Sequence, residues 1–208
     1  MSSAGFILLT DRNSVTTADT LNWATLGGSG TALPAGQLFT SSGGRTAHLP
    51  QGAFLLNVGV SQGFNAGFPI GQIVSYSGGD TVIQWVNPIS AAGAQVWGVS
   101  SAADVTLTAL DVLGNPIAGS SLVGSVGGGG GNVSFGLAGF VGLGGTGGQT
   151  FYGLRFSNSP QPYAVNILSF TPADTAAITI PAPSSSVVFA AVASALLALR
   201  RRRPSAAA

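Results

Sequence analysis

An all-β fold is predicted for this 208-residue chain, in the form of an antiparallel, jelly-roll-like β-sandwich followed by one hydrophobic C-terminal helix. Short segments rich in β-branched and aromatic residues recur roughly every 10 to 15 residues. Turn-forming residues separate these segments, and the chain contains 32 Gly and 11 Pro. No convincing helical pattern lies between the segments, which favours two packed sheets over a mixed fold.

In the first half of the chain the strand pattern is interrupted by polar turns. Asp11–Leu26 is predicted to form a short helix or a strand, with Trp23 as its hydrophobic anchor. Three segments further on have strand composition, namely Gln37–Thr40, Thr46–Leu49 and Phe54–Val60.

The second half has a clearer alternation of apolar and polar residues. In Val105–Leu110 the residues Val105, Leu107 and Ala109 are expected to face inward. The other predicted strands are Ile73–Tyr76, Thr81–Val86, Ala91–Val99, Ile117–Val123, Ser134–Val141, Phe151–Phe156 and Ala164–Phe170. Asn87 and Pro88 are expected to end one strand, while Gly127–Gly131 and Gly142–Gly148 are expected to be loops.

The end of the chain has a different composition. Residues 1–172 form the predicted sandwich domain and residues 173–186 a linker. Residues 187–199 are uncharged and rich in Ala and Leu, and they predict a transmembrane or sorting helix followed by a basic cytoplasmic tail at 200–208. Thirteen helical residues rise only about 20 Å, less than the roughly 30 Å hydrocarbon core, so a buried core helix with a solvated tail is the alternative.

Three parts of this tail occur in a known order. Pro181, Ala182 and Pro183 precede the apolar segment, and Arg200, Arg201, Arg202 and Arg203 follow it. The tail resembles the PEP-CTERM sorting signal of Gram-negative bacteria, which some catalogues call an ice-binding-protein C-terminal domain. The resemblance implies recognition by an exosortase-type enzyme at the inner membrane, cleavage near the proline motif, and delivery to the cell surface or extracellular matrix. Ala182 stands where the family usually has Glu.

The body of the chain also resembles the exported, jelly-roll-like domains that usually carry this tail. The matching pieces include Asn22-Trp23, the Gly63–Gly71 loop, Pro88–Gly93, Val105–Gly114 and Tyr163–Asn166. At the other terminus, Met1–Thr10 has no basic residue and too short an apolar run for a signal peptide. We therefore expect that translation starts further upstream or that the signal was lost.

Composition excludes several classes of function. The chain has no Cys, Lys or Glu, so disulfides, thiolate chemistry and P-loop phosphate binding are excluded. Before residue 187 there are three Arg and six Asp, a net charge of about −3, which gives the body no basic face for nucleic acid.

Two motifs suggest catalysis only in part. Gly59–Gly63 matches the G-x-S-x-G nucleophile elbow around Ser61, but no helix can follow it and the single histidine, His48, precedes the serine. Gly142–Gly147 matches G-x-G-x-x-G, but a strand rather than a helix follows. We therefore predict that the protein is not an enzyme, with an esterase built on Ser61 as a remote alternative.

Ligand binding has two sequence candidates. Trp85 and Trp97 lie on predicted strands, where they would form either the sandwich core or a platform on which sugars stack. Asp80, Asp104 and Asp111 are turn residues that could also bind a structural Ca²⁺, although no cofactor is predicted. The leading prediction is an exported, membrane-anchored or exosortase-processed envelope protein, and the alternative is a module for Ca²⁺-dependent adhesion or for binding extracellular polysaccharide.

Overall fold

The computed structural model describes residues 5–15, 19–58, 68, 72–98, 101–129, 138–157 and 162–173. The chain divides into two units, Met1–Asp174 and Thr175–Ala208, and every described residue belongs to the first. The described residues contain thirteen strands and two short 3₁₀ helices, which confirms the all-β prediction. The predicted helix at 187–199 lies outside them, and the predicted domain boundaries stay predictions.

All thirteen strands are hydrogen-bonded into one continuous sheet, which folds over at the long strand β8 (Thr81–Gly98) into two halves, called the two sheets below. One sheet has the order β10-β9-β12-β8-β5-β4, and nearly all of its pairings are antiparallel. Its members besides β8 are β4 (Gln37–Thr40), β5 (Thr46–Leu49), β9 (Ser101–Leu110), β10 (Leu122–Gly129) and β12 (Phe151–Ser157).

The second sheet has the order β1-β11-β8-β13, and the far edge of β13 pairs with β2 and with the series β7-β6-β3. Its members besides β8 are β1 (Gly5–Leu9), β2 (Asp19–Leu21), β3 (Ala32–Leu33), β6 (Ala53–Asn57), β7 (Ile73–Ser77), β11 (Gly139–Thr146) and β13 (Tyr163–Pro172). The two 3₁₀ helices, η1 (Arg12–Ser14) and η2 (Trp23–Thr25), lie beside β2 in the sequence.

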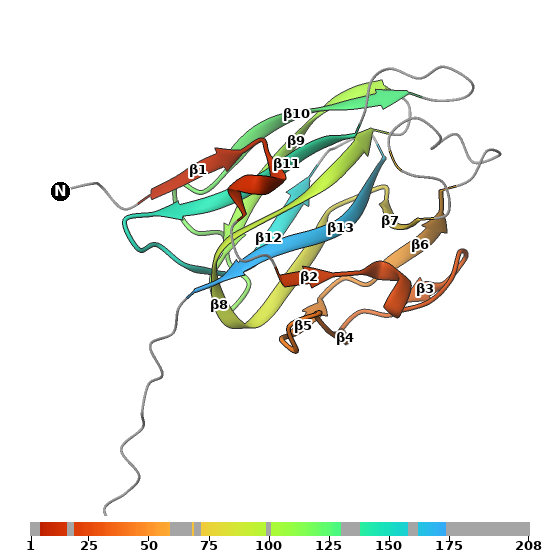
Figure 1. Cartoon of the computed structure of the whole chain (residues 1–208), viewed down its shortest axis with the longest axis horizontal. Helices are drawn as coiled ribbons and strands as arrows, with labels where there is room; N and C mark the ends of the chain where they lie inside the picture. The colour runs from red at the N-terminus through yellow and green to blue at the C-terminus, as the bar shows by residue number, and fades with distance from the viewer. Residues whose placement is uncertain are drawn as a thin grey trace, which may run out of the picture. The chain divides into compact units, whose positions relative to one another are not determined.

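β8 passes from one sheet to the other by a bend in its middle, which Figure 1 shows as a sharp turn of the ribbon. Four residues, 85–88, intervene between Gln84, which pairs with Gly153, and Ile89, which pairs with Phe151. The prediction that Asn87 and Pro88 end a strand is therefore wrong. Proline is tolerated at a bend or bulge, where the ladder needs no donor, and the Pro88 carbonyl still accepts a hydrogen bond from Ala173 N.

The main core lies between the two sheets. The ring of Trp85 lies 5.3 Å from that of Phe170, and the ring of Phe6 lies 6.0 Å from that of Phe151. Each of these pairs joins a residue of one sheet to a residue of the other. The inward prediction for Val105, Leu107 and Ala109 is confirmed, since all three are fully buried; hydrophobic burial between the faces therefore holds the sandwich together.

Two of the predicted loops are strands. β10 extends to Gly129, and β11 includes the Gly142–Thr146 part of the G-x-G-x-x-G match. Gly142 faces Gly93 on β8, and a Cβ on Gly93 would come within 2.7 Å of Gly142 Cα and 2.6 Å of the Phe140 ring. Glycine is required here because the two strands leave no space for a side chain, so these glycines indicate tight packing.

Candidate functional site

Two depressions on the surface lie next to each other and share the side chain of Gln51. Gln51 belongs to a tight turn that joins β5 to β6, in which Gly52 N donates to the Leu49 carbonyl at 3.3 Å. Pro50 favours the second position of such a turn, and Gly52 follows with a φ of +74° that suits glycine. The sequence therefore builds a compact turn that places Gln51 between the two depressions.

The smaller depression, which we call the Arg155 pocket, has a volume of about 240 Å³. Gln84 of β8 and Arg155 of β12 line it, and both alternate with buried residues of their strands. Val82 of β8, Leu110 of β9 and two turns provide the remaining walls. The full lining is Pro50, Gln51, Val82, Gln84, Leu110, Leu113, Gly114 and Arg155.

One wall of the Arg155 pocket is a turn organised by Asp111. The Asp111 carboxylate accepts hydrogen bonds from Leu113 N at 2.9 Å and from Asn115 N at 2.8 Å. Hydrogen bonds led by that of the Asn115 backbone lower the pKa of Asp111. Gln84 Nε2 donates to the Val112 carbonyl at 3.0 Å, which ties the turn to β8. The result is a well-ordered turn that holds Leu113 81% exposed.

The larger depression, which we call the Phe54 depression, has a volume of about 520 Å³. Phe54 of β6 and Tyr76 of β7 are direct cross-strand partners, so their side chains lie on the same face of the sheet. The Phe54 ring is 40% exposed. The full lining is Leu33, Gln51, Gly52, Ala53, Phe54, Tyr76, Gly78, Gly79 and Asp80.

A loose ion pair joins the two depressions. Asp80 lines the Phe54 depression and Arg155 lines the Arg155 pocket, with 3.8 Å between Arg155 Nε and Asp80 Oδ2. Each side chain is about a third exposed, at 35% for Asp80 and 33% for Arg155. Arg155 Nε is itself buried and has no hydrogen-bond partner in the described structure.

A buried tyrosine supports both members of the ion pair from the core. Tyr163 Oη accepts a hydrogen bond from Thr81 N at 2.8 Å and donates one to the Phe156 carbonyl at 2.6 Å. Thr81 follows Asp80 and Phe156 follows Arg155, and the two are cross-strand partners. Burial raises the pKa of Tyr163 to about 12, against the opposing effect of its Thr81 hydrogen bond. The hydroxyl therefore stays protonated and fixes the strand positions that carry the pair.

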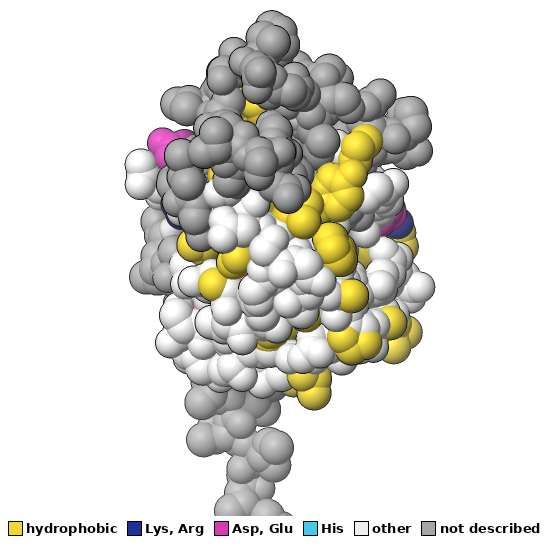
Figure 2. Space-filling view, turned by 90° about the vertical axis from the view of Figure 1, so that its right-hand side faces the viewer, with side chains coloured by type: hydrophobic (Ala, Val, Ile, Leu, Met, Phe, Trp, Pro, Cys, Tyr) yellow, Lys and Arg dark blue, Asp and Glu magenta, His cyan; other side chains and the backbone are white. Residues whose placement is uncertain are grey.

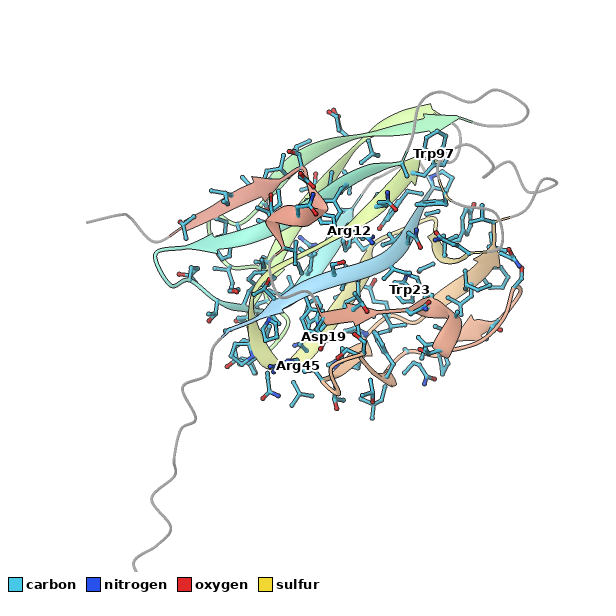
Figure 3. All side chains as sticks on the ribbon, in the orientation of Figure 1. Arg12, Asp19, Trp23, Arg45 and Trp97 are labelled. Carbon is cyan, nitrogen blue, oxygen red and sulfur yellow. The ribbon has the colours of Figure 1, made fainter. Side chains whose placement is uncertain are left out.

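The sequence candidates for sugar stacking are both buried. Trp85 is 3% exposed in the main core, and Trp97 is fully buried in a smaller cluster with Val74, Phe68 and Ala164. Neither indole presents a face to solvent, so the platform interpretation of these two residues is wrong and the core interpretation holds. Both residues belong to β8, and Trp97, labelled in Figure 3, lies near the end of that strand.

The candidate acidic residues do not come together. Asp80 pairs with Arg155, Asp104 accepts a hydrogen bond from Ser125 Oγ at 2.6 Å, and Asp111 organises its own turn. Within the part of the chain that the structure describes, no group of three His, Asp, Glu or Cys residues could hold a metal ion. His48 lies on β5 opposite Gln84, and Ser61 lies outside the described residues.

A second polar cluster surrounds Asp19, near Arg45 in Figure 3. Its carboxylate accepts hydrogen bonds from Ser41 Oγ (2.5 Å), Ser42 Oγ (2.8 Å), Gly43 N (2.6 Å) and Thr20 N (2.8 Å). Burial alone would raise the pKa of Asp19, but these hydrogen bonds outweigh burial and the pKa is lowered. Because four donors already occupy the carboxylate, it ties β2 to the β4–β5 turn and is not a binding group.

The residues of the sorting prediction lie outside the described part of the chain. These are Pro181, Ala182 and Pro183 of the motif and Arg200, Arg201, Arg202 and Arg203 of the basic tail. Across the described ranges no helix has the length and hydrophobicity needed to cross a membrane.

Sequence reasoning missed the residues that line the two depressions. Phe54 was assigned only to a strand, and Gln51 and Arg155 were given no role. The sequence signal that could have pointed to them is the aromatic Phe54 two residues after the turn-forming Pro50-Gln51-Gly52. The pairing of Asp80 with Arg155, 75 positions apart, had no sequence signal, because it depends on the register of β8 against β12.

Comparisons with known proteins give little. No protein-family model matches the chain, and no curated protein matches it in sequence. Among solved structures, the K2 cleaved adhesin domain of Lys-gingipain (Kgp) is similar at 11% identity, covering 80% of this chain and 99% of that chain. The TM-score of 0.28 does not establish a common fold, so no function is transferred from that protein.

Proposed function

We propose that this protein is a non-catalytic, jelly-roll-like binding module of the cell envelope, and that it binds an extracellular polysaccharide along the Phe54 depression and the Arg155 pocket. The observation that carries this proposal is that an exposed aromatic ring, amide side chains and a partly exposed ion pair line two adjacent depressions. Carbohydrates are bound by rings that pack on the apolar face of a sugar and by polar groups that fix its hydroxyls.

The geometry suits a chain-like ligand better than a small enclosed one. Both depressions are open to solvent and are lined in common by Gln51, with volumes of about 520 and 240 Å³. Figure 2 shows one face of the protein, on which hydrophobic side chains form a band and the charged side chains of described residues lie near the margins. A polymer of sugar rings offers alternating apolar faces and hydroxyls that fit such a surface.

The location is proposed from the tail. The order of Pro181–Pro183, residues 187–199 and Arg200–Arg203 supports sorting by an exosortase-type enzyme at the inner membrane, followed by display at the surface or in the matrix. Cell fractionation of the full chain and of an Arg200–Arg203→Ala variant tests this. We expect the full chain in envelope and matrix fractions and the variant to be mis-sorted, whereas intact full chain in the cytosol would refute the proposal.

Binding is tested with the purified full chain on an array of oligosaccharides and polysaccharides. We expect Phe54→Ala to weaken binding by about tenfold, because loss of a ring contact of about 1.4 kcal/mol corresponds to that factor. Val123→Ala is the matched control, since Val123 is also an exposed apolar residue, at 58%, and lines neither depression. An array without any bound glycan would refute the polysaccharide proposal.

A further inference from the structure

The gap between Asp80 and Arg155 is the observation from which a ligand class follows. At 3.8 Å, Arg155 Nε and Asp80 Oδ2 are too far apart for a direct hydrogen bond. Arg155 Nε has no accessible surface of its own, so a ligand would reach this guanidinium through its other nitrogens; each side chain is about a third exposed, at 33% for Arg155 and 35% for Asp80. Polar groups at such a separation are commonly connected by a small bridging group that can both donate and accept.

We propose that the ligand recognised at this site is an uncharged, hydroxyl-rich glycan, and that one of its hydroxyl groups, or a pair on neighbouring carbons, bridges Asp80 and Arg155. The proposal rests on the proposed function and assigns its specificity to this pair. A hydroxyl can accept a hydrogen bond from the guanidinium, which only donates, and can donate one to the carboxylate, which only accepts. Hydrogen bonds to charged groups are the stronger ones, so the bridge is worth more than an ordinary hydroxyl contact.

Charge favours a neutral ligand over an acidic one. A carboxylate on the ligand would gain from Arg155 but would lie close to Asp80, whose charge repels it. The three Arg and six Asp before residue 187 give this part of the chain a net charge of about −3, which does not attract a polyanion. No other charged residue lines either depression among the described residues.

The position of the pair suits it to reading one sugar unit within a longer chain. Asp80 faces the Phe54 depression and Arg155 faces the Arg155 pocket, so a ligand that occupies both must pass the pair. Gln51 lines both depressions, and the Tyr163 hydroxyl joins β8 at Thr81 to β12 at Phe156, the residues that follow Asp80 and Arg155. The pair is therefore placed and supported before the ligand arrives, which lowers the cost of ordering it on binding.

The test compares neutral and acidic probes on the purified full chain and on its Arg200–Arg203→Ala variant, which removes binding of acidic probes to the basic tail; the acidic-probe results are taken from the variant. The neutral probes are β-glucan, mannan and chitin oligosaccharides, and the acidic probes are alginate and polygalacturonate. We expect binding to at least one neutral probe, with an affinity that changes less than twofold between 50 and 500 mM NaCl, and no binding to the acidic probes. Binding to the acidic probes that weakens steeply with salt would overturn the proposal.

Three variants assign the effect to the pair. We expect Asp80→Asn and Arg155→Gln each to weaken binding of the neutral probe by about tenfold or more, and Arg155→Lys to give an intermediate loss because it keeps the charge without the planar fork. Urea midpoints of all three variants separate loss of binding from loss of folding.

The outcomes distinguish this proposal from the function on which it rests. If Phe54→Ala weakens binding while Arg155→Gln and Asp80→Asn do not, the polysaccharide function stands and the bridging role is refuted. If no probe binds to the folded full chain, both are refuted. If the pair variants and Phe54→Ala all weaken neutral-probe binding while the Val123→Ala control does not, both are supported.

Discussion

The hydroxyl of Tyr163 offers the sharpest test of how the site is supported. Tyr163→Phe removes one oxygen and leaves the shape of the buried ring unchanged. The oxygen accepts from Thr81 N at 2.8 Å and donates to the Phe156 carbonyl at 2.6 Å, and the residue is fully buried. Leaving a buried donor or acceptor unpaired costs about 1–3 kcal/mol, so losing both contacts is expected to cost about 3 kcal/mol.

Urea unfolding of the full chain, followed by tryptophan fluorescence, measures this loss. For a domain of this size, about 3 kcal/mol corresponds to a fall in Tm of roughly 6–12 °C. Tyr152→Phe is the control, since Tyr152 lies on β12, the strand whose Phe156 carbonyl accepts from Tyr163, but is only half-buried. We expect the control to change the free energy of unfolding by less than about 0.5 kcal/mol. A Tyr163→Phe protein as stable as the control would refute the role assigned to this hydroxyl.

Three further predictions concern pH and packing. Because burial raises the pKa of Tyr163 to about 12, the unfolded chain loses this proton first, and stability is expected to fall by about 2 kcal/mol between pH 10 and 12; equal urea midpoints across that range would contradict this. The pKa of Asp19 is lowered, so its contribution is present above about pH 4 and is lost as pH falls below that value. Asp19→Asn is accordingly expected to cost about 1–3 kcal/mol at pH 7 and progressively less as the pH falls below about 4, and a pH-independent difference between the urea midpoints would argue against the hydrogen-bonded carboxylate. Gly93→Ala is expected to destabilise by about 2 kcal/mol or more, because its methyl group would meet Phe140 and the facing strand, whereas Gly28→Ala, with open space around it, serves as the neutral control; similar thermal unfolding of the two variants would disprove the close approach of β8 and β11.

Local pattern was sufficient for the short strands. β4 and β5 have the predicted bounds, and β7 and β12 each extend only one residue beyond the prediction. Trp23, the predicted anchor, is only 1% exposed, and its indole nitrogen donates a hydrogen bond to the Asn166 carbonyl at 2.9 Å. These features follow from alternation and residue type, which act over a few neighbouring residues.

Glycine-rich strands were missed for the opposite reason. β10 and β11 were expected to contain loops because glycine has little intrinsic preference for a strand. Tertiary contact outweighs that preference when two backbones approach too closely for side chains, as at Gly93 and Gly142. The sequence shows where the glycines are, but the facing strand decides whether they form a loop or a ladder.

Composition and alternation alone determined that this protein is all-β, without disulfides, with a nearly uncharged body and a distinct basic tail. Only the tertiary structure decided which face each residue of β8 occupies. One residue, Ser90, is inserted between Ile89, which pairs with Pro172, and Ala91, which pairs with Thr171, so the residues on either side of it change faces. Because side chains alternate with a period of two, this shift places Val96 in the main core and Trp97 on the opposite face, and strand register likewise brings Asp80 and Arg155 together.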